Sequence, residues 1–361
     1  MNSLVLKKIV MTNDEESVSS NAVKWRRMMS KGIRAYMRQN PESFVRRARR
    51  GVPDEYRWDV WKACVDYDIH YKPGAYATLV QSKSEWSQMI SIDVPRTFTD
   101  ADHTLDLKRL VGSELVILER ILNAYANLNP EVGYCQGMNF IVGLLLLVSK
   151  KEEEIFWVFV CLMEFDGLNG FFKEGFPRLG LFVDAFDRIL DVEVCELRQH
   201  FITINVQPSI YIHQWYLTLF INTLPLQTVL VIWDSIMCDG LPVLVAITIA
   251  LLKVLKDVLL KMDFEDVIRF FKTMKTGEED FDAAMIGRLL VRHSSHIDIP
   301  SDMLKILRSN PNADEVPKLL EYHDSPEYRK KNDKSWISIL NQGFETFRSS
   351  ISTNSPNNAP N

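Results

Sequence analysis

The chain has 361 residues, of which 47% are hydrophobic and 25% charged, a balance typical of globular proteins that bury a substantial core. Its formal net charge of -5 argues against a generic nucleic-acid binder, because such a protein needs a surface that neutralises phosphates. The five cysteines are scattered singly, without a C-x-x-C pair, which predicts reduced thiols in a cytosolic protein rather than disulfides or a zinc site.

The N-terminal part divides into two segments of different character. Residues 1–22 are largely polar and predict a mobile leader. Residues 23–44 predict a basic amphipathic extension, because residues 24–50 carry ten Lys or Arg against one acid, Glu42, and Trp25 begins an apolar series at helical spacing. Two interpretations stay open: attraction to anionic lipid or to an acidic partner, and a solvated helix packed on the domain edge.

The first motif of the domain is Arg50-Gly51-Val52-Pro53. Gly and Pro favour a turn, and the acid that follows can cap a helix. Arg57 and Trp61 are four residues apart and therefore share one side of that helix. We expect structural roles for both.

A second motif surrounds a single arginine. Residues 82–92 predict a helix with Trp86, Met89 and Ile90 towards the core. Pro95 should end that helix, which places Arg96 just past it on a loop. Asp93 is close enough in sequence to orient the guanidinium, although a purely structural salt bridge is an equally simple interpretation.

A third motif surrounds a single glutamine. Residues 113–127 form an amphipathic helical pattern, and after it Gly133 and Gly137 bracket Gln136 at the mouth of a strongly apolar run, residues 138–148. We expect that run to be a helix through the middle of the domain. Gln136 could serve chemistry, or it could merely satisfy backbone groups at the helix start.

The remaining pattern is helical to residue 307. Residues 167–180 are loop-like, and after them Phe182, Phe186 and Leu190 share one helical face. Further helices are expected at 155–163, 210–224, 227–237, 241–261, 264–273, 282–291 and 302–307. Nothing alternates at period two, so we predict one large all-α domain of about 14–16 helices without significant sheet. The apolar runs are shorter than the roughly 20 residues of a membrane span. Residues 311–361 predict a C-terminal extension whose tail, 349–361, is disordered.

Several common active-site signatures are missing from the sequence. There is no Gly-x-x-x-x-Gly-Lys-Ser/Thr loop, so we expect no autonomous nucleotide hydrolysis. No Gly-x-Ser-x-Gly elbow suggests a hydrolase. His293 and His296 lack a third ligand at helical spacing, so we expect no metal site there.

The motifs resemble those of a known family. Ile90-x-x-Asp93-x-x-Arg96 and Tyr134-x-Gln136-Gly137 resemble the paired fingerprints of TBC domains, the GTPase-activating domains for Rab-type small GTPases. The resemblance extends to the opening motif and to later motifs, which include Gly51, Pro53, Arg57, Trp61, Gln214-Trp215, Leu224-Pro225-Leu226 and Ile232-Trp233-Asp234. It covers roughly residues 45–300 and places a Rab-GAP TBC domain at 45–310.

Two finer points follow from the same comparison. Gly170-Phe171-Phe172 and residues 261–271 look most like the RN-tre branch of the family. The family usually continues Arg-Thr-Phe-Pro, whereas this chain has Thr99 after Phe98. That departure leaves the proposed chemical groups in place but raises the question of full activity.

The resemblance implies an enzyme activator that acts in trans on a GTP-bound Rab-family GTPase and so regulates vesicle trafficking and intracellular protein transport. Arg96 and Gln136 would be the two catalytic fingers, because a guanidinium can stabilise phosphate charge and an amide can hold the attacking water. The expected support residues are Ile90, Asp93, Thr97, Phe98, Tyr134 and Gly137.

The same resemblance sets the expected surroundings of the protein. It implies no cofactor or metal of the chain's own, since GTP and Mg²⁺ belong to the partner. The scattered cysteines and the resemblance predict a cytoplasmic location, and the basic charge of residues 24–50 would allow peripheral contact with endomembranes. The alternative function is a non-catalytic Rab-binding scaffold or adaptor.

Overall fold

The computed structural model describes residues 18–98, 110, 112–275 and 282–310. Those residues form eighteen α-helices, α2 to α19, and contain no strand. The predicted all-α class is therefore confirmed. The helix number exceeds the expected 14–16 because the structure contains short helices such as α6 (Tyr67–His70) and α7 (Ala75–Leu79), which are too short to produce a clear period in the sequence.

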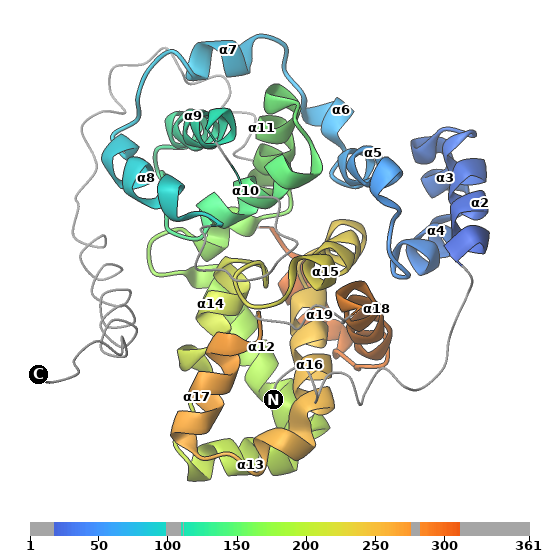
Figure 1. Ribbon diagram of the computed structural model, residues 1–361, viewed down its shortest axis with the longest axis vertical. Helices are drawn as coiled ribbons and strands as arrows, with labels where there is room; N and C mark the ends of the chain where they lie inside the picture. The colour runs from blue at the N-terminus through green and yellow to red at the C-terminus, as the bar shows by residue number, and fades with distance from the viewer. Residues whose placement is uncertain (1–17, 99–109, 111, 276–281, 311–361) are drawn as a thin grey trace, which may run out of the picture.

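Three N-terminal helices pack against the first helix of the domain. They are α2 (Val18–Met29), α3 (Ile33–Gln39) and α4 (Pro41–Ala48), and they lie beside α5 (Asp54–Cys64) in Figure 1. The Trp25 and Phe44 rings meet edge to face with centroids 6.3 Å apart, in a buried cluster completed by Met28, Ala48, Val52 and Val60. Residues 18–22, expected in the irregular leader, instead form the first turns of α2.

The helices that follow build the upper part of the molecule in Figure 1. They are α8 (Ser87–Asp93), the 3₁₀ turn η1 (Val94–Arg96), α9 (Ser113–Leu128), α10 (Met138–Val148) and α11 (Glu152–Val160), which ends in a π-helical turn, η2 (Cys161–Phe165). The predicted helix at 138–148 agrees with α10 at both ends. The helix expected over 82–92 begins only at Ser87, and Pro95 lies in η1 rather than directly after a helix end.

The lower part contains most of the later helices. They are η3 (Leu168–Phe171), α12 (Pro177–Glu193), α13 (Cys195–Thr203), η4 (Pro208–Ile210), α14 (Ile212–Leu217), α15 (Leu226–Asp239), α16 (Val243–Leu259), α17 (Phe264–Thr273), α18 (Ala283–Ser294) and α19 (Ser301–Arg308). No helix among the described residues is long and apolar enough to cross a membrane.

Two expectations in this part are wrong. The helix expected over 210–224 ends at Leu217, because Leu219 and Phe220 take positive φ angles of 45° and 65°, which a right-handed helix cannot contain. The segment 167–180, expected to be a loop, contains η3 and the start of α12.

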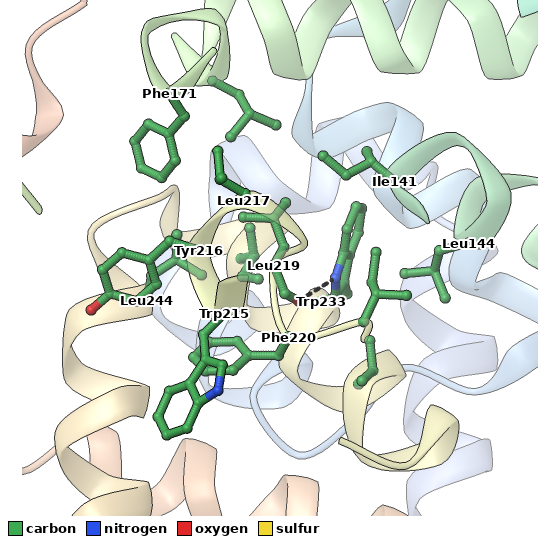
Figure 2. Packing of buried hydrophobic residues seen from close by; sticks show 14 of the residues in the cluster. Ile141, Leu144, Phe171, Trp215, Tyr216, Leu217, Leu219, Phe220, Trp233 and Leu244 are labelled. Carbon is green, nitrogen blue, oxygen red and sulfur yellow. Dashed lines mark hydrogen bonds between the residues drawn. The ribbon is translucent and has the colours of Figure 1, made fainter. Parts of the chain in front are cut away.

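The core at the junction of the two parts is built around Trp233 of α15 (Figure 2). Figure 2 shows its ring beside Ile141 and Leu144, which belong to α10. The indole nitrogen donates a hydrogen bond to the Leu219 carbonyl oxygen at 3.1 Å. This contact ties the irregular backbone after α14 to α15.

A second polar centre joins the opening motif to α15. Asp234 is fully buried and accepts hydrogen bonds from the Val52 backbone N–H (2.7 Å), Arg57 Nε (3.1 Å) and Trp61 Nε1 (2.8 Å). Burial raises the pKa of Asp234 to about 6, against the opposing positive charge of Arg57. Gly51 precedes this contact with a φ of 93°, so the opening motif and the later motif form one structural unit.

Candidate functional site

The two candidate finger residues project from separate segments. Arg96 is exposed and ends η1, whereas Gln136 is half-buried in the turn before α10. Within the described part of the chain, neither side chain forms a hydrogen bond or an ion pair. A guanidinium and an amide are therefore left available for another molecule.

The two segments are joined by a buried hydrogen bond. The Tyr134 hydroxyl donates to Asp93 Oδ2 at 3.0 Å, and both residues are buried. Burial raises the pKa of Asp93, while the Tyr134 hydrogen bond and the charge of Arg96 act in the opposite direction. Asp93 is thus hydrogen-bonded to Tyr134 and not to Arg96. Asp93 acts on Arg96 only as a nearby charge.

A second connection runs through Asn139, a residue that sequence reasoning missed. Asn139 Nδ2 donates to Thr97 Oγ1 at 2.8 Å, and Asn139 Oδ1 accepts from the Gly137 N–H at 3.0 Å. Asn139 lies in the first turn of α10, where the apolar run concealed it. A buried amide at a helix start was the signal that could have identified it, since buried polar groups require partners.

Glycine is required where the Gln136 turn meets its neighbours. A Cβ at Gly133, whose φ is 59°, would lie 2.1 Å from Trp86 Nε1. A Cβ at Gly137, whose φ is 115°, would lie 3.0 Å from the Leu217 carbonyl oxygen. Both positions therefore need the conformational freedom and the small size of glycine.

The remaining support residues anchor the arginine segment in the core. Ile90 is fully buried. Phe98 takes a positive φ of 55°, and its ring meets Phe140 of α10 edge to face with centroids 5.8 Å apart. A Cβ at Gly143 would lie 2.7 Å from the Phe98 ring, so this ring fits closely against α10. Thr99, the departure from the family pattern, lies outside the described residues.

No group of three or more His, Cys, Asp or Glu able to hold a metal occurs in the residues that the structure describes. Burial lowers the pKa of His293, with nearby positive groups acting in the same direction. Arg96 and Gln136 offer positive charge and hydrogen bonding, and neither side chain can act as a nucleophile or a general base near neutral pH.

The structure also resembles solved TBC domains. It matches the Chlamydomonas flagellar RabGAP TBC domain with a TM-score of 0.62 and 26% identity, over 76% of this chain and 92% of that one. The Ypt/Rab-GAP domain of Gyp1p matches with a TM-score of 0.58 at 18% identity, over 71% of this chain and 92% of that one, a likeness of fold alone.

Comparison with known sequences gives the same family. The Rab GTPase-activating protein eat-17 of Caenorhabditis elegans is 31% identical over 69% of this chain and 28% of its own length. The human ecotropic viral integration site 5 protein homolog is 29% identical over 82% of this chain and 35% of its own length. The chain thus spans about a third of these relatives. The Rab-GTPase-TBC domain family model matches residues 54–260, and the chain belongs to this family.

Proposed function

We propose that the chain is a GTPase-activating protein for a Rab-family small GTPase, to which it supplies Arg96 and Gln136 in trans. One observation carries the proposal. A guanidinium and an amide that form no hydrogen bond with the described residues are presented from two segments that buried hydrogen bonds hold together. A protein that only binds a GTPase would need neither group to be so braced.

The chemistry follows from what these groups can do. Phosphoryl transfer to water needs positive charge at the γ-phosphate oxygens and a group that holds the water in line. The guanidinium of Arg96 would provide the charge, and the Gln136 amide would provide the hydrogen bonds. GTP and Mg²⁺ would come with the partner. An arginine supplied in this way accelerates hydrolysis by roughly 10³–10⁵-fold in analogous GTPases.

The test is GTP hydrolysis by a panel of purified GTP-loaded Rabs with the wild-type chain, Arg96→Ala and Gln136→Ala. We expect acceleration of one or a few Rabs, a loss of most of it in Arg96→Ala, and a strong reduction in Gln136→Ala, with binding less affected than turnover. Arg26→Ala, which removes an exposed arginine of α2, is the matched control and should behave as wild type. Near-full activity of Arg96→Ala would refute the mechanism.

A non-catalytic scaffold is the second candidate. It predicts binding to a GTP-bound Rab without acceleration by the wild-type chain.

The exposed cations Arg26, Arg27, Lys31, Arg38 and Arg46, which lie along α2 to α4, favour an added contact with anionic membrane. Because Trp25 and Met28 are buried against the domain, this contact would be electrostatic and not an insertion of the apolar face. Co-sedimentation with anionic liposomes at low and high salt tests it.

The narrower family branch and the location are also proposals. The RN-tre-like assignment rests on Gly170-Phe171-Phe172 and residues 261–271, whereas the relatives described above carry other names. A cytoplasmic protein at endomembranes fits the proposed partner. Substrate preference in the Rab panel would test the branch.

A further inference from the structure

Asn139 lies between the two finger segments. Its side chain is 2% exposed, and its two amide ends point to different segments. Nδ2 donates to Thr97 Oγ1 at 2.8 Å, next to Arg96 in sequence. Oδ1 accepts from the Gly137 N–H at 3.0 Å, next to Gln136 in sequence. A single planar amide therefore spans the gap between the neighbours of the two fingers.

The hydrogen-bond network fixes the orientation of this amide. Thr97 Oγ1 donates to the Asp93 carbonyl oxygen at 3.1 Å, so its lone pairs face the Asn139 N–H. Turning the amide over would place its NH₂ group against the Gly137 N–H, which is a donor facing a donor. The order of donors runs from Asn139 through Thr97 to Asp93 and allows only one arrangement.

The neighbouring groups leave little room for adjustment. Gly137 has a φ of 115° and lies against the Leu217 carbonyl oxygen. The Thr97 γ-methyl would lie 3.1 Å from a Cβ at Gly143, so the threonine is held against α10. The backbone on each side of the amide is thus fixed by packing, and the amide sets how the two sides meet.

From this geometry we infer that Asn139 is a positioning residue, whose amide sets the placement of Arg96 relative to Gln136. The inference rests on the proposed function, because it assigns a purpose to the spacing of the two fingers. Misplacement of a reacting group by about 1 Å can reduce a rate about 10²-fold. The Tyr134 to Asp93 hydrogen bond braces the same two segments independently, so loss of the Asn139 bridge should loosen the site without unfolding the domain.

The sharpest test changes Thr97, since Asn139 variants can fail to fold by leaving the Gly137 N–H unpaired. Thr97→Val nearly keeps the shape and removes the hydroxyl, which accepts from Asn139 and donates to the Asp93 carbonyl oxygen. Thr97→Ser keeps the hydroxyl and removes the methyl packed near Gly143. Positioning predicts that Thr97→Val loses activity and Thr97→Ser retains it, whereas a packing role alone predicts that Thr97→Ser suffers more.

The measurement is the steady-state kinetics of the full chain with a GTP-loaded Rab that the wild type accelerates. We expect kcat to fall about 10–100-fold in Thr97→Val, with KM for the Rab within about threefold, and Thr97→Ser to stay within about threefold of wild type in both. Wild-type kcat in Thr97→Val, with Arg96→Ala inactive, would overturn the inference and leave the proposed function standing. If the wild type accelerated no Rab, the proposed function would fail first.

A second readout needs no GTPase. Hydrogen exchange of the Gly137 amide reports its bond to Asn139 Oδ1 directly. We expect faster exchange there in Thr97→Val than in wild type or Thr97→Ser, with exchange in α17 unchanged in all three. Equal Gly137 exchange in the three proteins would overturn the inference whatever the activity of the chain.

Discussion

The Tyr134 hydroxyl donates a hydrogen bond to Asp93 across 41 positions of sequence. Because Gln136 follows the tyrosine and Arg96 follows the aspartate, one buried bond couples the backbone of both candidate fingers. Burial and the adjacent Asp93 charge raise the pKa of Tyr134 well above its ordinary value, so the hydroxyl keeps its proton and remains the donor at neutral pH.

Removal of this hydroxyl should destabilise the domain. Tyr134→Phe keeps the ring but leaves a buried carboxyl of Asp93 without its donor, and we expect the free energy of unfolding in urea to fall by about 1.5–3 kcal/mol. Tyr211→Phe is the matched control. The Tyr211 hydroxyl is buried and has no hydrogen-bond partner in the described part of the chain, so its loss should be neutral or stabilising. Equal effects of the two changes would contradict the role of the bond.

Asp93 should also contribute to the pH dependence of stability. An acid whose pKa is higher in the folded state binds its proton more tightly there, so lowering the pH stabilises the fold. The gain starts as the pH falls through the raised pKa and is complete below the unfolded value, near 3.8. The unfolding free energy of wild type relative to Asp93→Asn should therefore rise as the pH is lowered from 7 towards 4. If the difference in unfolding free energy between wild type and Asp93→Asn were the same at both pH values, the pKa of Asp93 would be the same in the folded and unfolded states.

Gly133 should tolerate no side chain. Gly133→Ala would place a methyl group against the Trp86 indole at a φ of 59°, and the backbone term alone costs about 1–2 kcal/mol. Gly180→Ala is the opposite case, because Gly180 lies within α12 with nothing within 4 Å of its added Cβ. We expect that change to stabilise by about 0.5–1 kcal/mol. The melting temperatures of both variants check these opposite effects. A melting temperature of Gly133→Ala equal to or above that of wild type would contradict the close approach of Trp86 to Gly133.

The Asp234 centre should be the most sensitive polar site. Asp234→Asn removes the buried counter-charge of the Arg57 guanidinium, leaving it only the exposed Asp54, and presents an NH₂ group to a set of donors. We expect this change to cost about 3–5 kcal/mol. Asp266→Asn removes one partner of an exposed pair with Arg269 and should cost less than about 1 kcal/mol. Urea unfolding of the two variants gives the comparison. Similar unfolding midpoints would contradict the greater importance of the Asp234 centre for stability.

Local sequence signals predicted the long regular elements well. The 138–148 helix agrees with α10, which Gly137 precedes, and the 264–273 helix agrees with α17, which the capping acid Asp263 precedes. The sequence over 210–224 misled because its apolar residues continue through the positive-φ positions Leu219 and Phe220. Helical periodicity cannot register a backbone reversal that tertiary packing imposes.

The sequence predicted which residues form the site, but not how their side chains contact one another. Arg96 and Gln136 follow from the resemblance, but Arg96 lies in the 3₁₀ turn η1 rather than on the loop that Pro95 led us to expect. The partner of Asp93 and the role of Asn139 depend on contacts about 40 positions apart, which a single sequence does not reveal. The pairing of Arg57 and Trp61 with Asp234, more than 170 positions away, was hidden for the same reason.

The packing of α2 to α4 has a consequence for anyone who excises this domain. Val52 and Val60 owe their burial partly to Trp25 and Phe44, and Asp234 takes one hydrogen bond from the Val52 N–H. A fragment cut at residue 54, where the family match begins, would lose that donor and expose an apolar patch to neighbouring molecules. Such a fragment should aggregate during expression, so the shortest well-behaved piece begins upstream of Trp25.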